Sequence, residues 1–505
     1  GKMDFRLHTH TRPGPFHPPP VAQHTAVSLL GATSRYQTNV LDVPLDHDTP
    51  GDTRRHRIRY WVDDTAWKGA ADAPLFVEMP SESATNGPSS LNPFVEEHSG
   101  IGLFLEHRFF GQSVPNGLDT SPTSLQYLTA EQSLADVSSL VRHVAMERNL
   151  TGPVVAYGCS YPGAQAAWLR MRYPEQATAA IAASAPVAAR VDFNDLDRSV
   201  ALALQRASPS CLAKVTATME AVDVLATESA AGKRQLKRMF GMPDDEAAPQ
   251  GDFDLRYMLA DVVANGVQTG GKSSLCSHMD GVELDTAPFE LAQHFSKAFD
   301  LDSGFGGFQM AYKSEDLKRT DPDSAVKDYR LWTWLQCAEL GYLQTSNAQG
   351  DHGLPSVTAR SKHLTLQAFL SNCEYLFPGV QAATTRETSF NLEFGGVRPD
   401  EKDASNILYI KYRDDPWFML QPNSTGDDSR LRIVMSPDPA CAHCGMGCTD
   451  TMASEQRSAM SDWLLGRGAS TSLAAATSPS SSSDSAGVPQ IPQESPQPAP
   501  TALIP

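Results

Sequence analysis

The chain has 505 residues, of which 41% are hydrophobic and 20% are charged, and its formal net charge is −18. These values are typical of a globular protein with a large core and more than one domain, and the acidic balance argues against nucleic acid or an anionic membrane as a partner. No apolar run approaches the roughly 18 residues that a transmembrane helix needs, so we expect no membrane span.

Residues 1–35 are rich in His, Pro and Thr and show no apolar periodicity, which predicts a flexible leader. They contain no basic stretch followed by an apolar stretch, and the chain begins with Gly1. A signal peptide that has been removed and a start within a longer sequence both explain this beginning, and the sequence does not distinguish them.

Strand patterns begin after residue 36. Residues 56–62 alternate as a half-buried strand does, and the apolar runs at 74–79 and 102–107 end in polar residues, as is typical of buried strands. A capping box at residues 129–132 then opens a helix that runs to about Arg148.

The segment around Ser160 has the sequence form of a nucleophile elbow, a sharp strand-to-helix turn that exposes a serine hydroxyl. An apolar run at residues 153–158 ends in Gly158, and a helix-forming run begins at Gly163. The pattern departs from Gly-x-Ser-x-Gly because Pro162 stands where the second glycine is expected. The helix is expected to offer free N–H groups and the positive end of its dipole to a developing oxyanion.

The order of elements around this turn predicts the fold class. The helix at 163–173 is followed by a further apolar strand at 179–184. Near-continuous apolar strands that alternate with helices predict a mostly parallel sheet covered on both faces. We therefore expect an α/β fold.

Residues 190–398 have a different character, because helical periodicity dominates there and strand runs are scarce. This stretch is too long for a connection within a sheet, so we expect an inserted, mostly helical domain. Its glycine cluster at 304–307 lacks the strand-loop-helix context of a nucleotide site and is expected to be a loop.

The strand pattern resumes at residues 406–410 and 431–435, and a last helix is predicted at 454–465. The expected division is a leader at 1–35, an α/β domain in two parts at 36–189 and 399–467, the helical insertion at 190–398, and a disordered Ser/Pro-rich tail at 468–505.

A serine nucleophile needs a general base and a carboxylate that orients the base. In α/β-hydrolases these residues follow the serine in the order acid, then histidine, on loops after the last strands. Asp414 and Asp415 follow the strand at 406–410, and His443 follows the strand at 431–435. All lie at carboxyl ends of strands, where Ser160 also emerges, so we predict a catalytic site at this edge of the sheet.

The oxyanion is expected to be bound by the N–H of Tyr161, the residue after the predicted nucleophile, and by a donor in the loop after the strand at 74–79. Pro80 has no N–H, so Ser81 or a neighbouring residue is the expected second donor.

Cys441, Cys444 and Cys448 surround His443, and their C-x2-C-x3-C spacing leaves a zinc site as an alternative. The cluster lacks the distant second ligand pair of most structural zinc sites, so we expect disulfides or free thiols there, with no metal and no cofactor. The eight cysteines of the chain are too sparse to predict a disulfide scaffold, and Cys159 is expected to fill a small buried space.

Several short blocks occur in one order at residues 59–62, 106–115, 128–136, 158–164, 182–187, 334–341, 415–417 and 442–444. The block at 106–115, for example, reads Glu-His-Arg-Phe-Phe-Gly-Gln-Ser-Val-Pro. Together they make the chain, from about residue 36 to 466, similar to the lysosomal Pro-X carboxypeptidase and dipeptidyl peptidase II family of serine peptidases. Within that family the chain resembles the thymus-specific serine protease branch.

The resemblance implies an α/β-hydrolase fold with a helical cap, and it matches Asp415 rather than Asp414 to the acid of a Ser-Asp-His triad with Ser160 and His443. It implies a secreted, lysosomal or endosomal serine peptidase, with its signal peptide removed, that cleaves short peptides near a terminus and often after proline. Whether the protein forms a homodimer stays open. Glycosylation triplets at Asn149 and Asn423 favour the secretory pathway weakly.

Three departures from the family pattern bear on activity: Pro162, the pair Lys411-Tyr412, and the loss of the glycines around Glu82. Two alternatives therefore stay open, a weakened or silent homologue that binds peptides and an esterase on the same fold. Whether a peptidase of this kind would trim the carboxyl or the amino end, or cut internally, is not given by the sequence.

Overall fold

The structure is a computed structural model. It describes residues 36–465 except for 89–92, 229, 243–249, 302–312, 351–355, 381–382, 403, 424–430 and 449–451. The expected leader at 1–35, the expected tail at 468–505 and the glycine cluster at 304–307 lie outside the described residues.

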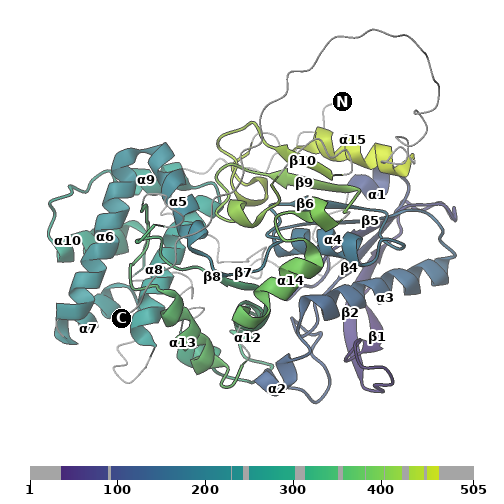
Figure 1. The fold of residues 1–505 in the computed structure, drawn as a ribbon, viewed down its shortest axis with the longest axis horizontal. Coiled ribbons are helices and arrows are strands. Elements are labelled where there is room, and N and C mark those ends of the chain that lie inside the picture. The colour runs from purple at the N-terminus through teal and green to yellow at the C-terminus, as the bar shows by residue number, and fades with distance from the viewer. Residues whose placement is uncertain are drawn as a thin grey trace, which may run out of the picture. The chain divides into compact units, whose positions relative to one another are not determined.

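An eight-stranded sheet forms the centre of the fold (Figure 1). Its strands, in spatial order, are β1 (Asn39–Pro44), β2 (Arg55–Asp63), β4 (Ile101–Leu105), β3 (Leu75–Glu78), β5 (Val154–Cys159), β6 (Ala179–Ala183), β9 (Ile407–Lys411) and β10 (Leu431–Met435). The pairs β1–β2 and β2–β4 are antiparallel, and all other neighbours are parallel. The predicted α/β-hydrolase fold class is confirmed.

Successive residues of each buried strand point to opposite faces of the sheet, and helices cover both faces. Val77 packs in one core with helices α3 (Ala130–Arg148) and α4 (Tyr161–Arg172). Its neighbour Phe76 packs in a second core with α1 (Pro93–Glu97) and α15 (Ala453–Leu464). Figure 1 shows α3 and α4 on one side of the sheet and α1 and α15 on the other. This is why the strands read as near-continuous apolar runs.

Helices dominate the chain between β6 and β9, and Figure 1 shows α6 to α10 gathered beside the sheet. The helices are α5 (Asn194–Ala207), α6 (Pro209–Glu228), α7 (Ala230–Met239), α8 (Gly251–Gln268), α9 (Lys272–Met279), α10 (Pro288–Ala298), α11 (Ser314–Leu317), α12 (Lys327–Leu335), α13 (Leu366–Leu376) and α14 (Glu387–Phe394). Two short strands, β7 (Arg190–Asp192) and β8 (Gly341–Leu343), pair in parallel. A π-helical turn (Gln336–Leu340) leads from the end of α12 directly into β8, so the helical pattern stops there at a short strand.

All eight cysteines form disulfides: Cys159–Cys444, Cys211–Cys276, Cys337–Cys373 and Cys441–Cys448. The expectation that the cysteines are too sparse for a disulfide framework is wrong, because folding brings together residues as far apart in sequence as 285 positions. The expectation for Cys159 is also wrong, since its sulfur is bonded to Cys444 rather than packed as a free side chain.

No helix in the part of the chain that the structure describes is long and apolar enough to span a bilayer. The two possible glycosylation residues are both exposed. Asn149 caps the carboxyl end of α3 in a left-handed conformation, whereas the residues that complete the triplet of Asn423 lie outside the described range.

Candidate active site

Ser160 occupies a strained turn between β5 and α4. Its backbone angles are φ 65° and ψ −135°, a combination that a non-glycine residue adopts only when its surroundings impose it. A Cβ atom on Gly158 would lie 2.5 Å from the backbone carbon of Pro162, and one on Gly163 would lie 2.7 Å from the carbonyl oxygen of Ala183. The turn therefore needs glycine at both positions, as a nucleophile elbow does.

Pro162 fits this turn. It lies in the first turn of α4, where a backbone N–H has no intrahelical acceptor and proline is well tolerated. The close approach to the neighbouring strand occurs one residue later, at Gly163. The departure from Gly-x-Ser-x-Gly is thus accommodated without a change in the form of the elbow.

His443 and Asp415 are joined by a hydrogen bond of 2.8 Å between Nδ1 and Oδ1, and both side chains are buried. Asp415 also accepts bonds from the N–H of Trp417 at 2.9 Å and from Nε2 of Gln421 at 2.6 Å. Three donors hold this carboxylate in place. With its proton on Nδ1, the imidazole has Nε2 free to accept a proton.

The neighbouring carboxylate has different partners. Asp414 pairs with Arg206 at 2.5 Å and with Lys272, and neither interaction involves His443. Of the two adjacent aspartates, the structure therefore brings only Asp415 to the histidine.

A cavity of about 190 Å³ brings the predicted residues together, since Ser160, Tyr161, Ser81 and His443 all line it. Among the described contacts there is no hydrogen bond between the Ser160 hydroxyl and the His443 imidazole. Hydrogen bonds of this kind are often long in a free enzyme and shorten when substrate binds.

The loop that carries Ser81 is fixed to α3 and α4. Gln165 Nε2 donates to the carbonyl of Pro80 at 2.6 Å, and Ser133 donates to Gln165 Oε1 at 2.8 Å. Sequence reasoning missed Gln165, and its signal in the sequence is only an amide side chain one helical turn after Tyr161. The N–H of Tyr161 lies in the first turn of α4, where no intrahelical acceptor exists. Tyr161 and Ser81, the expected oxyanion donors, thus line the same cavity as Ser160.

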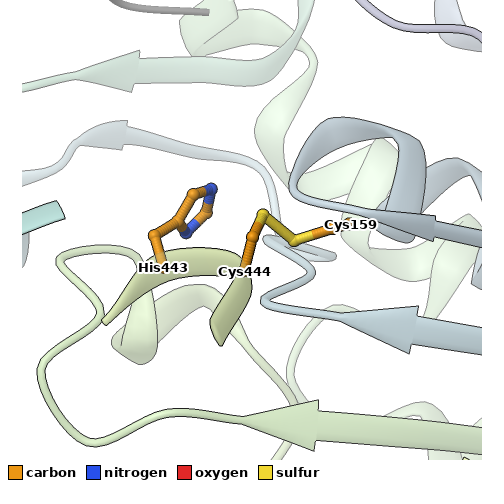
Figure 2. A group of neighbouring side chains, drawn as sticks. All are labelled: Cys159, His443 and Cys444. Carbon is orange, nitrogen blue, oxygen red and sulfur yellow. A yellow bond between two sulfur atoms is a disulfide. The ribbon is translucent and has the colours of Figure 1, made fainter. Parts of the chain in front are cut away.

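The Cys159–Cys444 disulfide lies next to His443 (Figure 2). It joins the residue before Ser160 to the residue after His443, and the N–H of Cys444 also donates to the hydroxyl of Ser184 at 2.8 Å. The two sulfurs and a ring nitrogen of His443 lie within 4.8 Å of one another, which is close enough for a metal ion. Zinc binds thiolates, however, and sulfurs bonded to each other are not thiolates.

Two further cavities adjoin the one around Ser160. A large one of about 820 Å³ shares Ser81, Cys159 and Pro162 with it. A small one of about 80 Å³ shares Trp332 and Trp417 with it and extends among the helices. The site therefore has a wide side and a narrow side.

Comparison with known proteins finds similarity to serine peptidases. A family profile described as serine carboxypeptidase S28 matches residues 43–458. Mouse thymus-specific serine protease is 28% identical over 431 residues, which cover 80% of this chain and 81% of that protein. The probable serine protease EDA2 of Arabidopsis thaliana is 27% identical over 84% of this chain and 83% of its own length. Mouse lysosomal Pro-X carboxypeptidase is 32% identical over 203 residues, 38% of this chain and 41% of that protein.

Proposed function

The chain belongs to the serine carboxypeptidase S28 family and is a serine peptidase, and we propose that it acts on peptides through an acyl-enzyme formed on Ser160. The observation that carries this proposal is the arrangement of a strained Ser160 and an Asp415-bound His443 on one cavity. A strained backbone at a serine that shares a cavity with a buried His–Asp pair is characteristic of a functional site rather than of a packing site.

In the proposed reaction, Ser160 Oγ attacks the carbonyl carbon of the scissile bond while His443 Nε2 accepts the hydroxyl proton. Asp415 keeps the proton of Nδ1 in place and stabilises the imidazolium that forms. The N–H groups of Tyr161 and Ser81 bind the oxyanion. His443 then gives its proton to the leaving amine, and a water molecule, activated by the same histidine, releases the acyl group and restores Ser160.

We further propose that residues 190–398 form a cap over this site and limit it to peptide ends and short peptides. The support is the position of α8, α12 and β8, which contribute Asn265, Trp332 and the region of Gln344 to the cavity around Ser160. A preference for proline is proposed by analogy with the relatives named as Pro-X carboxypeptidases.

A secreted, lysosomal or endosomal location belongs to the same proposal. Four disulfides form and persist most readily in an oxidising compartment. Relatives are named as lysosomal and extracellular carboxypeptidases, which agrees with this placement.

The decisive experiment is labelling with a fluorophosphonate probe, which reacts only with an activated serine. We expect the wild type to be labelled at pH 5 and at pH 7, and Ser160→Ala to lose all labelling. Ser83→Ala is the matched control, because Ser83 lines the same cavity but lies in the loop rather than on the elbow, and it is expected to keep labelling. A folded wild type that is not labelled at either pH would refute the proposal and favour a silent homologue that binds peptides.

A further inference from the structure

Lys411 is a buried lysine at the end of β9, at one of the places where the sequence departs from the family pattern. It is 4% exposed. Its Nζ donates to the carbonyl of Pro422 at 2.9 Å and to Oδ1 of Asn423 at 3.3 Å, and it lies 4.0 Å from the centre of the Phe418 ring. These partners are neutral. Burying an ammonium group is costly, so a lysine held by neutral partners indicates a functional reason for its charge.

The carbonyl that Lys411 binds belongs to the loop that carries Asp415. Residues 412–423 leave the end of β9, pass Asp415 and return to Lys411 at Pro422. Gln421, the residue before Pro422, donates to Oδ2 of Asp415 at 2.6 Å. Lys411 thus closes the loop at its base, directly beside one of the donors that hold the carboxylate.

The charge of Lys411 also acts on Asp415. Burial lowers the pKa of Lys411 from 10.5 to about 8, and the carboxylate of Asp415 opposes this shift. Lys411 is therefore a cation at pH 5 to 7, and the two groups attract each other across the loop.

The other charged groups around His443 have different surroundings. Asp414 pairs with Arg206 at 2.5 Å and with Lys272, so both of these cations have a carboxylate partner of their own. Burial raises the pKa of Glu82, which lines the cavity with His443, so its carboxyl holds a proton to a higher pH than an ordinary glutamate does. Lys411 differs from these groups because its charge is directed at the partner of the histidine.

We propose that Lys411 is a positioning residue that acts on His443 through Asp415. Its ammonium group closes the loop that holds the carboxylate, and its positive charge offsets part of the negative charge that the carboxylate presents to the imidazole. The imidazole is then protonated less readily, so His443 stays a free base at lower pH than it would without this lysine. This inference rests on the proposed function and deepens it, because it assigns a new residue to the same site.

The test measures the rate of fluorophosphonate labelling of Ser160 between pH 4 and pH 9, which needs no known peptide substrate. In Lys411→Met we expect the midpoint on the acid side of this profile to rise by about 0.5 to 1 pH unit, less than the roughly 1 to 3 units that a charge in direct contact causes. Well below the midpoint this is a loss of rate of about 3- to 10-fold. On the plateau the rate should also fall by about 10-fold, because the loop is no longer closed.

Three further variants separate charge from structure. Lys411→Arg keeps the charge and should keep the wild-type midpoint. Lys411→Gln keeps a donor without the charge, so its midpoint should rise, and it replaces Lys411→Met if that protein does not fold. Lys237→Met is the matched control: it removes another buried lysine, 5% exposed in α7, which lines none of the three cavities described above. It should keep both the midpoint and the plateau.

A wild-type midpoint in the folded Met or Gln variant, or a raised midpoint in the folded Arg variant, would overturn the role given to the charge. A wild-type plateau in Lys411→Met would overturn the closure of the loop. In both cases Ser160 is still labelled, whereas a wild type without any labelling would refute the proposed function instead. Thermal unfolding of each variant checks the fold.

Discussion

Replacing Asp254 by Asn should change how the stability of this protein depends on pH. Asp254 lies in α8 and accepts hydrogen bonds from the N–H of Ser314 at 3.0 Å and from its hydroxyl at 2.6 Å. Burial raises the pKa of Asp254 from 3.8 to about 7. Between these pH values the folded protein keeps a proton that the unfolded chain releases, so the free energy of unfolding falls as pH rises through this window.

The size of the effect follows from the pKa shift. Each pKa unit corresponds to about 1.4 kcal/mol, so a shift of about three units lowers the free energy of unfolding by up to about 4 kcal/mol once the pH exceeds 7. Asparagine is neutral at every pH and can still accept from the N–H of Ser314. Wild type and Asp254→Asn should therefore be equally stable near pH 4, and the variant should be more stable at pH 8.

Urea unfolding followed by fluorescence between pH 4 and pH 8, without reductant, measures this difference. Burial also raises the pKa of Asp197, Asp328 and Glu339, so the wild type and the variant should both lose stability as pH rises. The expected result is a difference between the two proteins that grows up to about pH 7 and then stays constant. Asp285→Asn, a change at an exposed carboxylate, should follow the wild type. Parallel curves for Asp254→Asn and the wild type would refute the reasoning.

Three further predictions concern the site. Asp415→Asn should lower kcat by about 10³- to 10⁴-fold in a peptide assay, because the imidazole of His443 loses its orienting acceptor. Asp414→Asn should mainly lower the melting temperature. Equal kinetic losses in the two variants would contradict the assignment of Asp415 as the partner of His443. Gly158→Ala should abolish fluorophosphonate labelling, since its Cβ would lie 2.5 Å from a backbone carbon, and normal labelling would show that the elbow tolerates a side chain. The double variant Cys159→Ser, Cys444→Ser should be labelled more slowly and lose more in kcat than in KM, and unchanged kinetics would show that the tether does not position the site.

The sequence predicted those parts of this fold that depend on local pattern. The apolar runs of β5 and β6 and the glycines on either side of Ser160 specify a strand, a tight turn and a helix within one short segment. The position of His443 was predictable because it follows the last strand of a parallel sheet, and such strands end at the same edge.

Features that depend on tertiary packing were not predictable in this way. Asp414 and Asp415 occupy the same loop, and only the ion pairs of Asp414 with Arg206 and Lys272 exclude it as the partner of His443. The disulfide of Cys159 depends on the approach of two loops whose distance no local pattern encodes. The place of Asn265 and Gln344 on the cavity around Ser160 likewise depends on packing between residues that are far apart in the sequence.

The long separation of Cys159 and Cys444 in the sequence also has a consequence during synthesis of the chain. Its two cysteines are separated by 285 residues, so at a synthesis rate of about 5–20 residues per second Cys444 is made about 15–60 s after Cys159. Throughout that interval the proposed nucleophile exists without its proposed base, while Cys211, Cys276, Cys337 and Cys373 are made in turn. A nascent chain therefore lacks the proposed catalytic pair until His443 has been made, and until then Cys159 has to stay unpaired with the earlier cysteines. The proposed hydrolytic activity can therefore begin only after residue 443 has been made.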